Sequence, residues 1–159
     1  MVASGVALAS GPRNEVGRFT IGTRGLNILA SNQVVAFAVP DPKVRGITCH
    51  VQTVEAKGLT LSADPTYASI ACRQTGKLFA EDVAKVSQKP DGEDIFSQST
   101  WGLGGRGSGG LLNTLFQALN VKRIWDGDNQ TYIYVTYTTQ LFNGVPRTNI
   151  STVPTYGQF

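Results

Sequence analysis

The stretch that decides the fold class is LNVKRIWDGDNQTYIYVTYTT, residues 119–139. It contains two runs rich in β-branched and aromatic residues, 119–126 and 131–139, around a short polar segment. This pattern predicts an antiparallel hairpin that turns at Asp126 to Asn129, with Gly127 available for a positive φ. Alternation along the second strand predicts one face with Tyr132, Tyr134, Thr136 and Thr138, and another with Ile133, Val135, Tyr137 and Thr139.

The polar segment of this hairpin also resembles part of a calcium-binding loop. Asp126, Asp128 and Asn129 have suitable oxygen ligands, but the later glutamate that completes such a loop is missing. Asp and Asn are also the residues that β-turns prefer. We therefore interpret these residues as turn residues and expect no metal site.

The rest of the chain shows the same preference for short strands. Gly 18 and Pro 7 among 159 residues make it rich in turns, and helical patterns are few. We expect a mainly β, antiparallel, sandwich-like single domain with one or two short helices. The other predicted strands are 15–22, 33–39, 46–54, 67–74 and 94–99, and the predicted helices are 78–87 and 111–119.

Composition and charge exclude several classes of protein. The net charge is +3, but the basic residues are scattered and interrupted by acids, so we expect no nucleic-acid partner. No apolar run reaches the roughly 20 residues of a membrane span. Residues 1–14 contain Ala7-Leu8-Ala9, an export-cleavage pattern, but lack a charged signal start. This segment is therefore predicted to be an N-terminal arm or a residual targeting segment.

Both cysteines and the single histidine lie between residues 46 and 76. Cys49 and His50 are neighbours in a predicted strand, so their side chains point to opposite faces and do not form a nucleophile pair. Three such residues are also too few for a structural zinc site. Cys72 lies in a second β-prone run, which leaves two alternatives: a disulfide that joins the strands, or two buried free thiols.

A glycine-rich stretch, residues 102–110, fits the letters of a dinucleotide-binding motif, G-x-G-x-x-G. That motif works within a β-α-β unit with parallel strands, whereas the segment that follows is half of an antiparallel hairpin. We therefore predict a surface loop that binds no nucleotide, and we expect no cofactor.

Several blocks of the chain together resemble the CreA family, exported bacterial proteins without an established molecular function. The most specific are Asp41-Pro42 leading into Ile47-Thr48-Cys49, and Ile70-Ala71-Cys72. The closing block, PRTNISTVP at 146–154, belongs to the same pattern, and the order of the blocks holds over about residues 15–154. The stretch at 102–110 looks like an insertion into that pattern.

The resemblance implies a disulfide between Cys49 and Cys72, because family members are similar in having this cysteine pair. It also implies an exported or lumenal location, in a bacterial periplasm or alternatively in a plastid or other organelle. The family supplies no catalytic residues to carry over. We divide the chain into the arm 1–14, a CreA-like β domain at 15–154 and a C-terminal tail at 155–159.

Three hypotheses about function follow from these observations. The first is a non-enzymatic protein–protein interaction module, or a structural or linker subunit of a larger assembly, whose arms order against partners. The second is a small-ligand binding protein that uses the tyrosine face of 131–139. An enzyme is the least supported, because Glu81, Asp82, Glu93 and Asp94 look like solvated charges and no nucleophile has a base. The candidate partner-binding residues are Trp101, Arg106, Tyr156 and Phe159.

Overall fold

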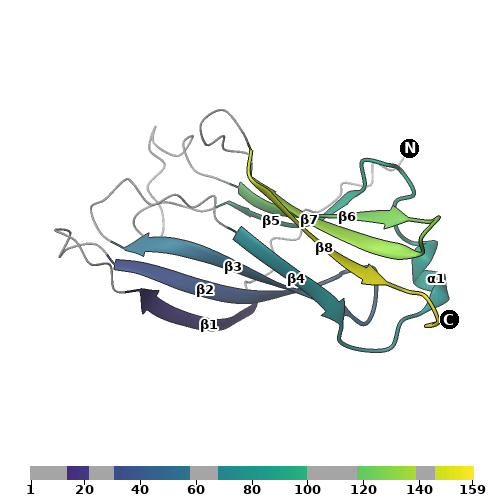
Figure 1. Cartoon of the computed structure of the whole chain (residues 1–159), viewed down its shortest axis with the longest axis horizontal. Coiled ribbons are helices and arrows are strands. Elements are labelled where there is room, and N and C mark those ends of the chain that lie inside the picture. Colours follow the sequence, from purple (N-terminus) through teal and green to yellow (C-terminus); the bar gives the residue numbers. More distant parts are fainter. Residues whose placement is uncertain (1–13, 22–30, 58–67, 100–117, 139–145) are drawn as a thin grey trace, which may run out of the picture.

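A computed structural model describes residues 14–21, 31–57, 68–99, 118–138 and 146–159, and it shows two four-stranded antiparallel sheets (Figure 1). The sheets have the orders β1-β2-β3-β4 and β5-β6-β7-β8, and every neighbouring pair is antiparallel. The expectation of a mainly β, sandwich-like fold is confirmed. The elements are β1 (Asn14–Ile21), β2 (Ser31–Pro40), β3 (Ile47–Lys57), β4 (Ala68–Gln74), α1 (Ala80–Val83), β5 (Glu93–Ser99), β6 (Ala118–Asp126), β7 (Thr131–Thr138) and β8 (Thr148–Pro154).

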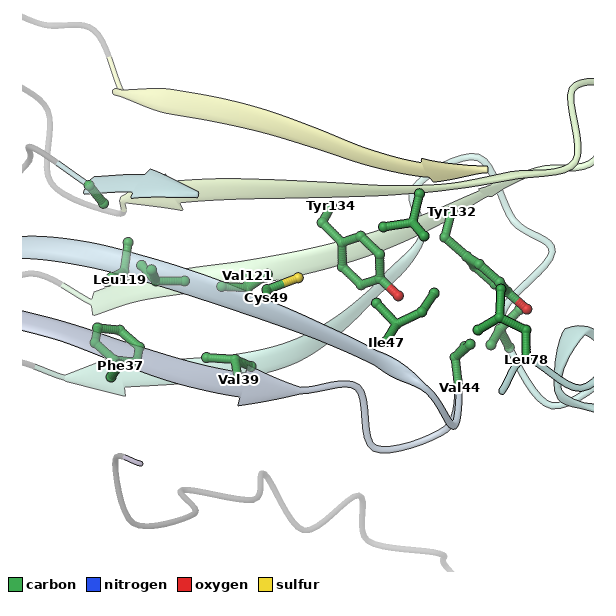
Figure 2. Close-up of a cluster of buried hydrophobic side chains, with 14 residues drawn as sticks. Phe37, Val39, Val44, Ile47, Cys49, Leu78, Leu119, Val121, Tyr132 and Tyr134 are labelled. Atoms are coloured by element: carbon green, nitrogen blue, oxygen red, sulfur yellow. The ribbon is translucent and has the colours of Figure 1, made fainter. Parts of the chain in front are cut away.

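The core lies between the two sheets and takes side chains from both (Figure 2). From the first sheet, alternate residues of β2 and β3 point inward, including Phe37, Val39 and Cys49. From the second, Val121 of β6 and Tyr134 of β7 are fully buried. Alternation along a strand is what allows one face of each sheet to become core while the other stays outside.

The predicted hairpin is confirmed. β6 pairs with β7 from Leu119↔Thr138 to Asp126↔Thr131. In the turn, the Asn129 N–H donates to the Asp126 carboxylate at 3.1 Å, which confirms the interpretation of these residues as turn residues. The expected position of the positive φ was wrong: it occurs at Gln130, with a φ of 47°, because the turn extends to that residue before β7 begins.

Helical structure is shorter than predicted. The helix predicted at 78–87 is reduced to α1, which has four residues. Its N-cap, Phe79, has extended backbone and offers no side-chain hydrogen bond to the first turn, so nothing extends the helix at that end. The helix predicted at 111–119 lies mostly outside the described residues, and its last two residues open β6 instead.

β8 was not predicted as a strand. It pairs with β7 over seven residues, from Thr131↔Pro154 to Tyr137↔Thr148. The sheet therefore continues to Pro154, the last residue before the C-terminal tail. Thr155 follows directly, and both its N–H and its hydroxyl donate to the Gln130 carbonyl, at 2.8 and 2.7 Å.

The loop from β2 to β3 is held closed by Gly46, whose φ is 83°. Its carbonyl accepts hydrogen bonds from the N–H groups of Thr75 and Gly76, at 2.8 and 3.2 Å. A side chain here would meet the Lys77 carbonyl oxygen, 2.4 Å from the position of a Cβ atom. Only glycine fits both the backbone conformation and this close approach.

None of the helices within the described ranges is long and apolar enough to cross a membrane.

Candidate functional site

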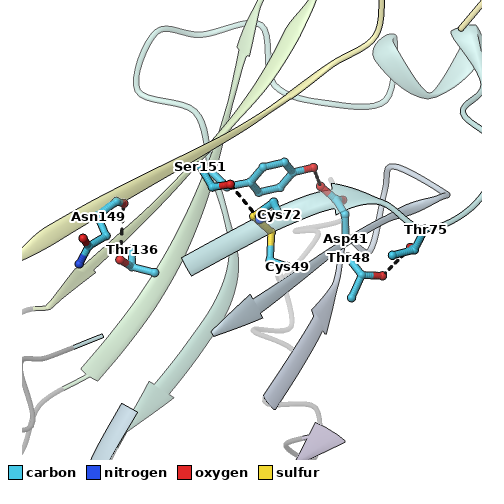
Figure 3. The surroundings of a disulfide bond; sticks show 9 residues. Asp41, Thr48, Cys49, Cys72, Thr75, Thr136, Asn149 and Ser151 are labelled. Carbon is cyan, nitrogen blue, oxygen red and sulfur yellow. Dashed lines mark hydrogen bonds between the residues drawn. A yellow bond between two sulfur atoms is a disulfide. The ribbon is translucent and has the colours of Figure 1, made fainter. Parts of the chain in front are cut away.

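Cys49 and Cys72 form a disulfide between β3 and β4 (Figure 3). The two residues lie directly opposite each other in the register of these strands, with their Cα atoms 3.9 Å apart. This separation is shorter than the usual range of about 4.4–6.8 Å for disulfides. Cys49 is fully buried in the core, whereas His50, its neighbour, points to the other face and is half-buried. The disulfide that the family resemblance implied is confirmed.

Polar side chains of β8 form hydrogen bonds with backbone groups at the edge of β4. The Cys72 N–H donates to the Ser151 hydroxyl oxygen at 2.8 Å, and the Asn149 side-chain amide donates to the Ala68 carbonyl (Figure 3 shows the first of these bonds). Backbone groups at a sheet edge need partners when another strand covers them. β4 and β8 lie side by side (Figure 1), and these side chains join the two sheets there. The bond from Ser151 lies next to the disulfide (Figure 3).

Asp41 is the centre of a buried polar network at the end of β2. One carboxylate oxygen accepts the backbone N–H groups of Lys43 and Val44, each at 2.9 Å. The other accepts the Tyr134 hydroxyl at 2.8 Å. The guanidinium of Arg123 also donates to this carboxylate, and both side chains of the pair are almost completely buried. Asp41 thus connects the first sheet to two strands of the second.

The other side of the Arg123 guanidinium contacts Glu93, at 2.6 Å. Glu93 also forms an ion pair with Lys43, which is more exposed. Burial raises the pKa of Glu93, but the hydrogen bond from Lys43 and the charge of Arg123 outweigh it, so the pKa is lowered overall. Glu93 is therefore fixed as a carboxylate that balances Arg123.

The tyrosine face of β7 packs into the core and is not open to solvent. Tyr132 and Tyr134 are both buried (Figure 2), and burial is the main reason that their pKa values are raised, that of Tyr132 to about 12. The Tyr132 ring packs against Trp125 with the ring centres 4.7 Å apart. The Tyr132 hydroxyl is the buried side-chain polar atom without a hydrogen-bond partner among the described residues.

A second buried carboxylate lies at α1. Asp82, expected to be solvated, is completely buried, and its carboxylate accepts the backbone N–H and the guanidinium of Arg45, with the closest contact at 2.8 Å. Hydrogen bonds from Arg45 and Lys85 hold the pKa of Asp82 well below its ordinary value despite burial. The Arg45 guanidinium also lies over the Phe79 ring, 3.8 Å from its centre. The prediction that Asp82 is solvated was wrong, because its partner Arg45 lies in a loop that is distant in the sequence. Glu93, also predicted to be solvated, is only partly exposed.

The four candidate partner-binding residues divide into two groups. Tyr156 and Phe159 are 86% and 55% exposed, so their rings lie at the surface. Trp101 and Arg106 lie outside the described residues, as does the stretch 102–110. Among the described residues, no three His, Cys, Asp or Glu side chains gather in a way that could hold a metal ion.

Sequence reasoning missed the Asp41–Arg123 pair, although the alternation in β6 contains a signal for the burial of Arg123. Val121, Arg123 and Trp125 alternate along β6, so a strand with an inward apolar face also places Arg123 inward. A buried arginine requires an acidic partner, and Asp41 lies 82 residues away in the sequence. The hydrogen bonds of these groups are directed at each other, and the arrangement acts by locking the two sheets together.

The fold, the buried ion pair and the disulfide define a class of protein: a two-sheet antiparallel β domain with one disulfide. Residues 19–158 match the family model described as CreA protein, and the chain belongs to this family. It is 29% identical to Protein CreA of Escherichia coli strain K12 over 127 residues, which is 77% of this chain and 73% of that protein. Protein CreA of Escherichia coli O6:H1 and of O157:H7 match equally. No solved structure matches the chain.

Proposed function

We propose that this chain is a non-enzymatic protein–protein interaction module that acts as a structural or linker subunit of a larger assembly. The observation that carries the proposal is the presentation of two aromatic side chains, Tyr156 and Phe159, to solvent directly after β8. Aromatic side chains are enriched among the residues that supply most of the binding energy at protein interfaces.

The segment that carries these aromatic residues is anchored to the domain. Thr155 is buried and makes two hydrogen bonds to the Gln130 carbonyl, and the Gln158 N–H donates to the Thr155 carbonyl at 3.0 Å. A backbone that is already held in place loses less conformational freedom when a partner binds. Tyr156 and Phe159 are therefore suited to act as anchors for another protein.

The proposed compartment is an exported or lumenal one, such as a bacterial periplasm or an organelle lumen. Disulfides persist in oxidising compartments and are rare where thiols are kept reduced. The Cys49–Cys72 bond fits such a compartment, and the relatives that the chain matches are bacterial proteins.

The test is native mass measurement of a tagged full-length chain, purified under non-denaturing conditions from the cells that make it. We expect specific protein subunits to remain bound to the unmodified chain and to be lost from a Tyr156→Ser/Phe159→Ser double variant. Gln158→Ala, between the two aromatic residues, is the matched control and should retain them. An unmodified chain that carries no other subunit, or a double variant that keeps the same subunits, contradicts the proposal.

Small-ligand binding through the tyrosine face stays an untested prediction. The two tyrosines on which this hypothesis depends, Tyr132 and Tyr134, are buried in the core, and the Tyr134 hydroxyl donates a hydrogen bond to Asp41. A bound small molecule of constant mass in the same measurement would favour this alternative.

A further inference from the structure

β1 is an edge strand with an unusual surface for its position. Its hydrogen-bonded neighbour among the described strands is β2, and all eight of its residues are exposed. Phe19 is 62% exposed, and Val16 and Ile21 are also among the exposed large apolar residues. An exposed edge strand with apolar side chains is a template on which another strand can pair.

The part of β1 that can pair regularly is short and has a clear centre. The register with β2 shifts between Glu15 and Gly17, which marks an irregularity, and the strand ends at Ile21. A bulge interrupts regular pairing, so the regular segment is Gly17 to Ile21. Phe19 is the middle residue of this segment.

We propose that β1 pairs antiparallel with β1 of a second copy of this chain, with Phe19 on the two-fold axis. A two-fold axis perpendicular to the sheet preserves its faces, so a residue must lie opposite its own copy. Centring on Phe19 places the two phenylalanine rings opposite each other. It also places Gly17 opposite Ile21 of the second copy, a small residue against a large one on the same face as the rings.

The charges of β1 permit this arrangement. Arg18 and Glu15 form a bidentate ion pair within the strand, with both hydrogen bonds at 2.9 Å. Arg18 also donates to the side chain of Gln33 at 2.9 Å. The pair neutralises the strand, so two copies meet without repulsion between their arginines. Arg18 would lie opposite Thr20 of the second copy.

A five-residue strand pair is small compared with the roughly 800 Å² that each partner buries in a standard stable interface. The dimer is therefore expected to be weak and to depend on concentration. Its formation would continue the sheet across both molecules, as an eight-stranded sheet of order β4-β3-β2-β1-β1-β2-β3-β4.

Analytical ultracentrifugation of the purified full-length chain over a wide range of concentrations tests the proposal. The expected mass rises from one chain to two as concentration increases. Phe19→Glu should give one chain at every concentration, and its far-ultraviolet circular dichroism spectrum should confirm that it folds. Ile150→Glu is the matched control, because Ile150 is 65% exposed on β8 at the edge of the other sheet; it should dimerise like the unmodified chain.

Cysteine cross-linking tests the register. Phe19→Cys places two introduced thiols opposite each other, and mild oxidation should join two chains through this position. Thr20→Cys lies opposite Arg18 of the second copy and should cross-link much less. A chain that stays single at all concentrations, or a dimer unaffected by Phe19→Glu, or equal cross-linking at both positions, overturns the proposal. None of these results would bear on binding through Tyr156 and Phe159, so the two proposals can fail separately.

Discussion

Arg123 joins the two sheets through its buried ion pair with Asp41. It donates to Asp41 and to Glu93 and is buried with Asp41. Arg123→Met keeps much of the side-chain volume but leaves the Asp41 carboxylate buried without a cation. We expect the free energy of unfolding in urea to fall by about 3–5 kcal/mol.

Lys122→Met is the matched control for this variant. Lys122 neighbours Arg123 on β6, but its ion pair with Asp94 has an N–O distance of 3.7 Å and is partly exposed. Removing it should cost less than about 1 kcal/mol. Equal losses for the two variants would mean that the buried network does not hold the sheets together.

Asp82 and Glu93 predict how stability depends on pH. The pKa of each is lowered in the folded protein, by hydrogen bonds from Arg45 and Lys85 to Asp82, and for Glu93 by Lys43 and Arg123 against the opposing effect of burial. A carboxyl group with a lowered folded pKa stabilises the protein above its unfolded pKa, and this contribution is lost as pH falls through the folded pKa. The free energy of unfolding should therefore fall as the pH drops below about 4.

Asp82→Asn should flatten this acid-induced decline, because Asn does not titrate, even if the variant is less stable at every pH. Asp91→Asn, at an exposed position, should leave the decline unchanged. Urea unfolding measured from neutral to acidic pH supplies the comparison, and identical slopes for Asp82→Asn and the unmodified chain would disprove the assignment.

At the scale of elements, β8 joins the sheets by means of polar side chains. Ser151→Ala removes the acceptor of the Cys72 N–H and leaves that group without its partner. We expect a loss of about 1–2 kcal/mol in the free energy of unfolding, together with faster hydrogen exchange of the Cys72 amide. Ser69→Ala makes the same chemical change at an exposed position of β4 and should change neither quantity. Unaltered exchange at Cys72 in the Ser151 variant would contradict this role.

The sequence predicts the elements that depend on local pattern and misses those that depend on contacts with distant residues. The hairpin of β6 and β7 is local and has strong turn chemistry, so pattern alone finds it. In β8, Asn149 and Ser151 occupy positions where a sandwich strand usually has apolar residues, because they bond to β4, and the alternation that marks a strand is lost. The environment of Asp82 in α1 was also not predictable, because Arg45, which binds its carboxylate, lies in the distant loop between β2 and β3.

In the candidate site too, contacts between residues far apart in the sequence were not predicted. The disulfide was implied by resemblance to the CreA family and is present. The choice of Tyr156 and Phe159 as partner-binding residues stays a prediction; both side chains are exposed. The partners of Asp41 were not predictable, because Arg123 and Tyr134 are 82 and 93 residues away from it. Only the packing of the two sheets brings these groups together.

The whole molecule is a two-sheet β sandwich, and the central claim is that a disulfide joins β3 to β4 within its first sheet, beside β8. The bond spans a sequence separation of 23 residues, and closing a loop of this length in the unfolded chain stabilises the fold by about 3 kcal/mol. Reduction should lower the unfolding free energy by a similar amount without changing the secondary structure.

Mass spectrometry of a tryptic digest tests this claim most directly, with protein kept from reductants and alkylated during denaturation. Trypsin cleaves after Arg45, Lys57 and Arg73, so Cys49 and Cys72 fall on separate peptides, 46–57 and 58–73. The account predicts one species with the combined mass of both peptides less two hydrogens, which separates into the two peptides on reduction. Two separate peptides, each carrying an alkylated cysteine before any reduction, would contradict it.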